Sequence, residues 1–382
     1  MSSYQRFGMR IGGISAYAPR HRISNDRIAA RLRKERMSIA AEQRRNGHEV
    51  LDRKQKKQFE TSDRWIRRFI GFSERRFAAD AEGTIDLAAR AALALLAETG
   101  LRPAEIDGIV FGTVTPSYLN SPPDAAILQD RLGIPTHIGE SPREFHCIDC
   151  SLACSTWVTS LHHAYMLISS GMAKNVLVIG ADKMSTTINW RDRAFACVLG
   201  DAGTATWCIA VPPEEDWFSP KQFWSWASGK DGDVIITPAG GSSRPIQTER
   251  EIREYQNRLT MDGAMVRELM VPLIGGPGIQ AALKKAGWTL GDIDLATLHE
   301  ANLTLNQEII TQWKRNGFQG TVLDAGGQFG NTTSASIPLA VALNAAALSM
   351  GKRFVWFAFG GGLSASAVLG QVKHPLTAVI SV

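Results

Sequence analysis

Cys154 lies where the pattern of the sequence changes, and its position suggests a reactive thiol. The residues before it show no helical period, whereas those from Trp157 to Ile168 place apolar side chains at three- and four-residue spacing. This spacing predicts a largely buried helix that begins just after Cys154 and ends near Gly171. A thiol in the first turn of a helix feels the positive end of the helix dipole, so we expect a lowered pKa and a nucleophilic thiolate. The alternative is a small core residue, the commoner role of a cysteine on an apolar segment.

Two other segments carry side chains that complement a nucleophilic cysteine. His299 and Asn302 follow an apolar strand in the segment TLHEAN, and Asn331 opens an apolar helix in GNTTSASIPLA. Taken singly, a histidine at a strand end is often structural, and an asparagine before a helix is often its N-cap. Together with Cys154 they supply a nucleophile, a base and an amide donor, the set needed for acyl transfer through a thioester.

The cysteines before Cys154 allow a different interpretation. Cys147, Cys150 and Cys154 have a spacing that metal and iron–sulfur sites also use. A closed site needs four ligands, so Cys197 or Cys208 would have to supply the fourth. We expect no metal, and we place Cys147 and Cys150 as core residues in the strand and loop that lead to the nucleophile.

Two halves of the chain repeat the same order of elements. Residues 84–113 and 278–302 each read as an amphipathic helix, a turn and an apolar strand. The helix after Cys154 leads into the strand NVLVIGAD, and the helix of TTSASIPLAVALNAAALSM leads into the strand RFVWFAFGGG. Alternating helices and strands predict an α/β fold with mainly parallel strands, and the repetition predicts a duplication with halves 1–210 and 211–382. Sites in such sheets gather at strand ends and half–half junctions, where the three chemical segments fall.

Residues 210–258 break this order. Trp217, Phe223, Trp224 and Trp226 stand near proline and glycine, which favours a packed cap or loop. We expect these aromatic side chains to pack in the core, and an aromatic-lined substrate tunnel is the alternative.

The composition is that of a globular protein of 382 residues, with 44% hydrophobic and 21% charged residues, enough to build a full core. No run of eighteen apolar residues is present, and the N-terminus lacks the apolar stretch of a secretory signal, so we expect neither a membrane span nor secretion. Five cysteines are too few for a disulfide scaffold and fit reduced thiols in the cytoplasm.

The positive charge is concentrated in one segment. Residues 31–57 hold ten basic and four acidic residues, a net charge of +6 in a chain whose total is +5. A solvated helix is the simplest interpretation of such a run, and a docking surface for an acidic partner is the functional one. We expect no nucleic-acid binding, because aromatic residues are nearly absent from the segment and no nucleic-acid motif accompanies it.

Several short motifs follow one another in a recognisable order along nearly the whole chain. SNDRIA and TSDRWIRRFIGFSERRFA flank the basic segment (about 31–60), and IDGIVFGTVTP, LGD, MDG, HEAN, GNTTSASIPLA and FGGGLSAS come later. Asp149 precedes Cys154 by five residues. In these motifs and in that spacing the chain resembles the β-ketoacyl-acyl-carrier-protein synthase III group of the thiolase-like condensing enzymes, with the basic segment as an insertion. The resemblance implies a duplicated, five-layered α-β-α-β-α fold.

The resemblance also implies a role for each residue. Cys154 would take an acyl group from a thioester, while His299 and Asn331 would bind the carbonyl of a malonyl-type extender and stabilise the enolate left by decarboxylation. The backbone amides of Cys154 and Gly362 would form the oxyanion hole. Contacts to coenzyme A are implied for Thr61, Trp65, Arg193 and Asn302.

The implied enzyme is a cytoplasmic homodimer that uses acyl-coenzyme A and acyl-carrier-protein thioesters without a resident cofactor, and makes β-ketoacyl products for fatty acid or polyketide-like biosynthesis. A specialised homologue that joins two acyl chains, as in pyrone, cyclohexanedione or resorcinol formation, stays open, as does acyl transfer without decarboxylation. A non-catalytic partner subunit is disfavoured, since such partners usually lose one of the three catalytic side chains. A degradative thiolase needs a late second cysteine, and none follows Cys208.

Four positions depart from the pattern of this family. Phe69 and Thr304 stand where the family has arginines, Glu300 replaces a glutamine, and Ser121 replaces the aromatic residue that closes the acyl pocket from the neighbouring subunit. We therefore expect altered coenzyme A contacts and a roomier pocket for medium or functionalised acyl chains. The carrier-protein patch would move to Lys314 and Arg315 or to the basic segment.

Overall fold

Two β-sheets form the centre of the protein, whose computed structural model describes residues 7–46 and 51–381. The first sheet has six strands in the order β17-β1-β9-β8-β4-β7. β4, β7 and β8 run parallel, whereas β9 is antiparallel to both β8 and β1. The strands are β1 (Gly8–Tyr17), β4 (Gly108–Gly112), β7 (His146–Cys150), β8 (Asn175–Lys183), β9 (Asp201–Val211) and β17 (Thr377–Ser381).

The second sheet has five strands in the order β10-β16-β15-β13-β14. β13 is parallel to β14 and β15, whereas β16 is antiparallel to β15 and β10. Both sheets are mixed. In the second sheet β16 is antiparallel because β15 turns into it through a short loop that leaves no room for a crossover helix. The strands are β10 (Phe223–Ala227), β13 (Leu295–Leu298), β14 (Thr321–Val322), β15 (Arg353–Gly360) and β16 (Ser364–Gln371).

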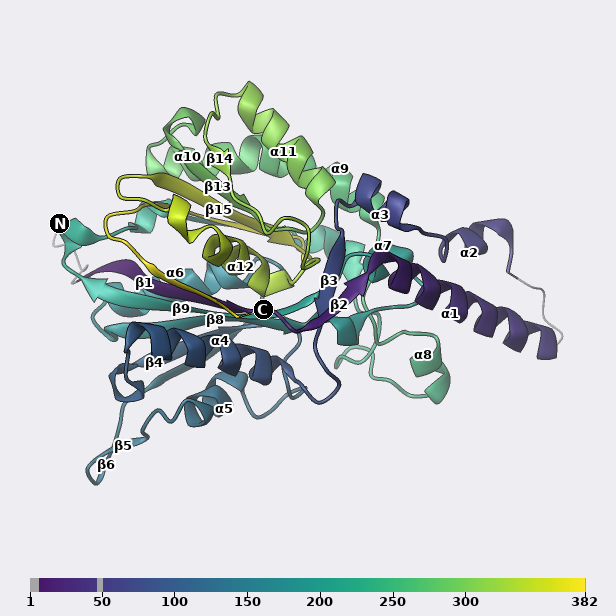
Figure 1. Ribbon diagram of the computed structural model, residues 1–382, viewed down its shortest axis with the longest axis horizontal. Coiled ribbons are helices and arrows are strands. Elements are labelled where there is room, and N and C mark those ends of the chain that lie inside the picture. The colour runs from purple at the N-terminus through teal and green to yellow at the C-terminus, as the bar shows by residue number, and fades with distance from the viewer. Residues whose placement is uncertain (1–6, 47–50, 382) are drawn as a thin grey trace.

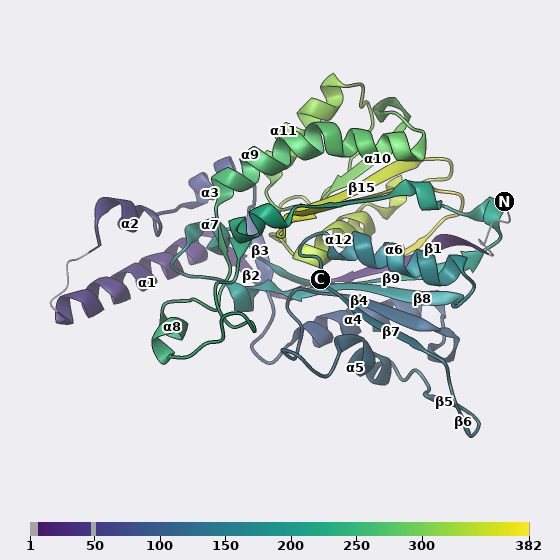
Figure 2. The ribbon, with the colours of Figure 1, turned by 180° about the vertical axis from the view of Figure 1, so that it is seen from behind.

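Helices cover both faces of both sheets. α6 (Thr156–Ser169) and α12 (Ser336–Leu343) lie between the sheets, while α4 (Thr84–Thr99) and α5 (Asp124–Arg131) cover the outer face of the first sheet (Figures 1 and 2). α9 (Gly263–Leu273), α10 (Ile279–Ala286) and α11 (Leu303–Arg315) cover the second, with a short π-helical turn, Ile274–Gly278, joining α9 to α10. The predicted five layers are confirmed, and α12 is apolar all round because both of its faces are buried.

The repeated segments form the elements that their periodicity predicts. α4 leads to β4 and α10 leads to β13, while α6 leads to β8 and α12 leads to β15. The first sheet takes its strands from residues 8–211 and the second from residues 223–371, but β17 returns to pair in parallel with β1. The last strand of the chain therefore ties the C-terminal half to the first sheet.

A separate substructure precedes α4. β2 (His21–Ser24) pairs with β3 (Glu74–Phe77), and between them the chain forms α1 (Asn25–Arg45), α2 (Arg53–Lys57) and α3 (Asp63–Phe69). α1 and α2 project from one end of the body, beside α3 and α7 (Arg193–Ala196) (Figure 1). The described part of the basic segment is thus largely helical and exposed, as its composition predicts.

The region 210–258 contains more regular structure than a cap or loop. Phe223 begins β10, an edge strand of the second sheet, because Phe223 and Trp217 are buried in the core that this strand covers. The remaining short elements are α8 (Glu249–Arg253), the paired strands β11 (Ile235–Ile236) and β12 (Thr260–Met261), and the paired strands β5 (His137–Ile138) and β6 (Ser141–Pro142). None of the helices in the described part of the chain is both long and apolar enough to span a bilayer.

Candidate active site

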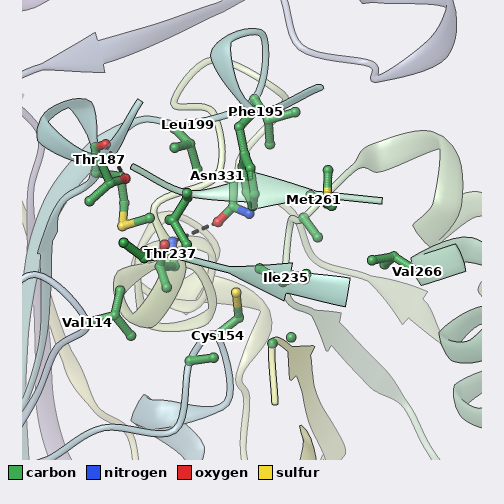
Figure 3. A pocket seen from close by; sticks show the side chains of 18 of the residues that line it. Val114, Cys154, Thr187, Phe195, Leu199, Ile235, Thr237, Met261, Val266 and Asn331 are labelled. Carbon is green, nitrogen blue, oxygen red and sulfur yellow. Dashed lines mark hydrogen bonds between the residues drawn. The ribbon is translucent and has the colours of Figure 1, made fainter. Parts of the chain in front are cut away.

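Cys154 lies in a tight turn between β7 and α6. Ala153, just before it, has a φ of 47°, in the left-handed region that costs a non-glycine residue about 1–2 kcal/mol. The turn is closed by the Ser155 N–H, which donates to the Leu152 carbonyl at 3.0 Å, and by the Leu152 N–H, which donates to Thr156 Oγ1 at 2.7 Å. This geometry directs the Cys154 side chain into a cavity between the two halves (Figure 3).

The thiol of Cys154 is protonated in this environment. Burial raises its pKa to about 12 and the charge of Asp182 adds to the rise, while the backbone N–H groups of Cys154 and Gly361 lower it. The sequence pattern predicts a lowered pKa from the helix dipole, and this prediction is wrong. α6 begins only at Thr156, and loss of hydration outweighs the dipole. The thiol must therefore lose its proton during any attack on a substrate.

The glycine-rich end of β15 packs directly against this thiol. A Cβ at Gly360 would lie 2.7 Å from the Cβ of Cys154 and 2.9 Å from its sulfur, so only glycine fits. The backbone N–H groups of Gly361 and of Cys154 itself lie close enough to the sulfur to lower the pKa of the thiol. The position expected from the sequence was Gly362, one residue further along. Two amides that converge on a nucleophile can stabilise a tetrahedral oxyanion.

His299 directly follows β13 and is completely buried. Its N–H donates to the Phe357 carbonyl at 2.9 Å, and its own carbonyl accepts from the Asn306 side chain at 3.0 Å. Neither ring nitrogen has a hydrogen-bond partner within the described residues, and the ring packs edge-on against Phe359, with 5.8 Å between centroids. Burial lowers the pKa of His299 to about 3, so the imidazole is neutral, and the described part of the fold engages neither ring nitrogen.

Asn331 is fixed at the junction of the two halves. Its N–H donates to the Val198 carbonyl at 2.8 Å, and its carbonyl accepts from the Gly200 N–H at 2.9 Å. Its Oδ1 accepts from the Thr333 N–H at 2.8 Å (Figure 3). This bond sets the orientation of the side-chain amide and leaves Nδ2 as the group that can donate to a ligand.

One cavity of about 160 Å³ joins Cys154, Gly361 and Asn331, whereas His299 does not line it. Cys154, Asn331 and Gly361 all line it, and Phe359, which also lines it, carries the wall back to His299. Figure 3 shows Cys154 and Asn331 on the wall of the same cavity, which Ile235 of β11 and Met261 of β12 also line. The other walls are mostly apolar, with side chains from Val114, Met184, Phe195, Leu199, Ile235 and Met261.

Asp182 is a residue near the nucleophile that the sequence gives no reason to single out. It lies one residue before the end of β8 and is completely buried, and its two carboxylate oxygens accept six hydrogen bonds from Thr113, Val114, Thr115 and Ser334. It thereby joins the loop after β4 to the 3₁₀ turn that precedes α12. A pattern in one segment cannot reveal it, because its partners come from two distant segments. Asp149, by contrast, accepts the N–H groups of Asp124 and Ala125 and so caps α5.

Three of the residues implied for coenzyme A lie together beside residues that line the cavity, although none of the three lines it. The guanidinium of Arg193 stacks on the ring of Trp65, 4.4 Å from its centroid. Thr61 Oγ1 accepts from the Cys197 thiol at 3.7 Å, in the same cluster. Phe69, in place of the family's arginine, is half-exposed and packs against Trp65 with 5.3 Å between centroids. The cluster offers an aromatic and cationic surface beside the cavity.

Asn302 has a different place from this cluster. Its Oδ1 accepts the N–H groups of Thr304 and Leu305 at 2.9 and 3.2 Å, so it is the N-cap of α11. Its Nδ2 donates to the Phe69 carbonyl at 3.1 Å. Both polar ends of the side chain are therefore engaged within the fold, which favours a structural role over coenzyme A binding.

Glu300 is buried directly after His299. Its N–H donates to Ser336 Oγ at 2.8 Å, and its Oε1 accepts from the Ala325 N–H. Burial raises the pKa of this carboxyl to about 7, and the nearby charge of Asp324 adds to the rise. Glu300 thus connects the end of β13 to the start of α12 and to the loop that leads to Asn331.

Two of the expected groups lie outside this cavity. Ser121 is exposed on the loop between β4 and α5 and does not line the cavity of its own chain. Cys147 is exposed on the edge strand β7, not in the core, because no further strand covers this edge.

Within residues 7–46 and 51–381, no three histidine, cysteine, aspartate or glutamate side chains are grouped to hold a metal ion.

Two family models match the sequence around these residues. The one described as 3-Oxoacyl-[acyl-carrier-protein (ACP)] synthase III matches residues 148–219, which include Cys154. The one described as the C-terminal part of the same synthase matches residues 283–372, which include His299 and Asn331.

Whole proteins are similar over most of the chain. A protein from Sulfurovum sp. (strain NBC37-1), named Beta-ketoacyl-[acyl-carrier-protein] synthase III, is 34% identical over 82% of this chain and 89% of its own. A protein of the same name from Chlamydia muridarum is 32% identical over 82% of this chain and 92% of its own. The solved structure of a 3-oxoacyl-(acyl-carrier protein) synthase from Burkholderia xenovorans LB400 has 27% identity and a TM-score of 0.77, covering 100% of both chains.

Proposed function

The chain belongs to the β-ketoacyl-[acyl-carrier-protein] synthase III family of condensing acyltransferases, and we propose that Cys154 is the residue that carries the acyl group. The observation behind this proposal is one cavity lined by a cysteine thiol, the amide of Gly361 and the side chain of Asn331, with the unpartnered ring of His299 behind its wall. Carbonyl chemistry uses such a set of nucleophile and hydrogen-bond donors.

In the loading half-reaction the thiol of Cys154 adds to the carbonyl of an acyl thioester. The N–H groups of Cys154 and Gly361 hydrogen-bond the oxyanion that forms. When the tetrahedral intermediate collapses, its bond to the departing thiolate breaks. The proton that Cys154 gives up ends on this departing group, which leaves as a thiol. Because the resting thiol is protonated, its proton must move as the new bond to sulfur forms, and the departing thiolate is the group that takes it up.

In the condensing half-reaction a malonyl-type thioester occupies the vacated end of the cavity. Loss of CO2 leaves an enolate, whose oxygen accepts hydrogen bonds from His299 and from Asn331 Nδ2. The enolate carbon attacks the acyl carbonyl, the bond to Cys154 breaks, and the thiolate takes up one proton. A histidine whose pKa is about 3 suits this role, because a neutral imidazole donates a hydrogen bond without protonating the carbanion.

The shape of the cavity favours acyl chains longer than acetyl. One water-sized group needs about 10–15 Å³ of such space, so 160 Å³ accommodates on the order of ten. Most of the lining is apolar, which favours an unbranched or lightly functionalised chain. The small Ser121, at the position of the family's closing aromatic, is consistent with this preference.

We place this reaction in the cytoplasm, in a homodimer that takes coenzyme A and acyl-carrier-protein thioesters and needs no resident cofactor. The stacked Trp65 and Arg193 support binding of coenzyme A, since an aromatic face and a guanidinium suit an adenine ring and phosphates. The relatives named above act, by their names, in β-ketoacyl-[acyl-carrier-protein] synthesis.

A panel of acyl-coenzyme A primers from acetyl to dodecanoyl, each with malonyl-carrier protein, tests this function. Mass spectrometry of the products should show β-ketoacyl thioesters two carbons longer than a medium-chain primer, with CO2 released. If acetyl-coenzyme A were much the best primer, the proposed pocket preference would be wrong. If no primer gave a condensed product, the condensing role itself would be wrong.

A further inference from the structure

The basic segment forms an arm that projects beside the cavity. α1 has 21 residues, about 31 Å of helix. Its buried residues, Asn25, Ile28, Ala29 and Leu32, all lie in its first eight positions. The rest of α1, together with α2, extends beyond α3 and α7 in both views (Figures 1 and 2). Residues 25–46 and 51–60 are called the basic arm here.

The described parts of the basic arm are held in place by specific contacts. Leu51 and Phe59 are buried, and the Leu51 N–H donates to the Gln43 side chain on α1 at 3.2 Å. Asp52 and Gln55 form a reciprocal capping box at the start of α2, with hydrogen bonds of 2.8 and 2.9 Å. The charges of α2 therefore keep a defined position beside those of α1.

Most of the positive charge of the arm faces solvent. Glu35 pairs with Arg191 at 3.7 Å and Glu60 pairs with Arg36 at 3.3 Å, so two of its acidic side chains are used within the chain. A further set of basic side chains is exposed and forms no ion pair in the described part of the chain: Arg33, Lys34, Arg44, Arg45, Arg53, Lys56 and Lys57. Such a surface attracts an acidic macromolecule at distances up to the Debye length, about 8 Å at physiological salt.

An exposed apolar side chain stands within this charge. Met37 is 68% exposed, and it shares a helix face with Arg33, four residues before it, and Arg44, seven residues after it. Methionine and arginine are both enriched in protein–protein interfaces, where an apolar centre is surrounded by a polar rim. A nucleic acid or a small anion would gain nothing from Met37.

The root of the arm packs against residues that line the active-site cavity. Ile28 and Leu32 of α1 pack in one core cluster with Phe195 and Leu199, which line the cavity. The arm ends at the aromatic and cationic cluster, where the Arg193 N–H donates to the Gln58 carbonyl at 3.2 Å. A partner seated on the arm would thus hold a flexible thioester arm at the entrance to Cys154.

We propose that the basic arm is the docking surface for the acidic acyl carrier protein that delivers the extender thioester. This inference rests on the proposed condensing function and names the surface that this function uses. The position at which the family places a docking arginine is Thr304, in the first turn of α11, so the arm supplies charge that α11 lacks there.

Two charge-reversed proteins of equal net charge test this inference. The first carries Arg33→Glu, Arg44→Glu and Arg45→Glu on the arm. The second carries Lys174→Glu, Lys221→Glu and Lys284→Glu, three exposed lysines outside the arm. Each is assayed with malonyl-carrier protein and with malonyl-coenzyme A, after loading with the same acyl-coenzyme A.

The arm variant should raise KM for malonyl-carrier protein at least tenfold with little change in kcat, while its kinetics with malonyl-coenzyme A stay within about twofold of the unmodified enzyme. The control variant should match the unmodified enzyme with both substrates. Equal KM values for malonyl-carrier protein in the arm variant and the control variant would overturn the inference. A tenfold rise in this KM that appears only in a third variant, Lys314→Glu/Arg315→Glu on α11, would overturn it as well. Loss of binding to anionic phospholipid vesicles with an unchanged carrier-protein KM would point to a membrane and also overturn it. An unmodified enzyme that condenses neither substrate would instead refute the proposed function.

Discussion

Replacement of Glu300 by glutamine should change how the stability of the protein depends on pH. The carboxyl lies between His299 and the loop to Asn331, and burial raises its pKa from 4.5 to about 7. The folded protein therefore holds this proton more tightly than the unfolded chain does. The stabilisation is fully present below about pH 4.5 and is lost as the pH rises through about 7.

The size of the effect follows from these two pKa values. At pH 5 the folded carboxyl is almost fully protonated and the unfolded one is mostly ionised, whereas at pH 8 both are ionised. The difference amounts to about 2.5 kcal/mol between pH 5 and pH 8 at 1.36 kcal/mol per pKa unit. Glu300→Gln keeps an acceptor for the Ala325 N–H but cannot ionise, so its stability should lack this loss.

Urea unfolding of both proteins at pH 5, 6, 7 and 8 measures the difference. Other groups, including His299, titrate in both proteins and cancel when the two are compared at each pH. The unmodified protein should lose about 2.5 kcal/mol relative to Glu300→Gln over this range. The exposed Glu98 serves as a control, since Glu98→Gln should leave the comparison flat. This reasoning would be refuted if the difference in unfolding free energy between the unmodified protein and Glu300→Gln did not change with pH. It would also be refuted if the unmodified protein became relatively more stable at high pH.

Three further substitutions test the geometry of the site. Gly360→Ala should lower condensation on the order of 10²-fold in steady-state assays, because the new Cβ displaces Cys154, while Gly276→Ala, with no atom within 4 Å of the added Cβ, should leave the rate unchanged. Asp182→Ala should cost about 3 kcal/mol or more in chemical unfolding, since it strips six buried hydrogen bonds of their acceptor; a loss below about 1 kcal/mol would contradict the network. Asn331→Ala should still load an acyl group, seen by mass, but release CO2 from malonyl thioester about 10²–10³-fold more slowly, and an unchanged release would remove Asn331 from enolate stabilisation.

The parts of the structure that the sequence predicts well are those set by local patterns. The apolar periods after Cys154 and within 84–99 predict α6 and α4, and the glycine, asparagine and histidine segments fall at strand and helix ends as expected. Local periodicity works here because each helix and strand is buried on a defined face. Which residue of a loop reaches a given atom is harder to predict from the sequence. The backbone amide beside the Cys154 sulfur belongs to Gly361, whereas the sequence led us to expect Gly362.

The parts that escape sequence reasoning depend on tertiary burial. The pKa of Cys154 rises because the folded chain buries the thiol away from water. A local sequence pattern does not predict the extent of this burial. Asp182 gathers donors from two distant segments, so its role appears only when the two halves are assembled. The basic segment predicts an exposed helix by its charge, but its place beside Trp65 and Arg193 follows from the packing of Ile28 and Leu32.

The central claim is that Cys154 carries the acyl group from a thioester to an extender, and intact-mass spectrometry tests it directly. The unmodified enzyme, mixed with octanoyl-coenzyme A, should gain the mass of one octanoyl group per chain, and malonyl-carrier protein should then remove it and yield the β-ketoacyl product. The same measurement on three single variants identifies which cysteine carries the adduct. The variants are Cys154→Ser and, for the two buried cysteines, Cys197→Ser and Cys208→Ser. The account predicts that only Cys154→Ser abolishes both the adduct and the product. An adduct that persists in Cys154→Ser, or one that malonyl-carrier protein cannot discharge from the unmodified enzyme, would contradict it.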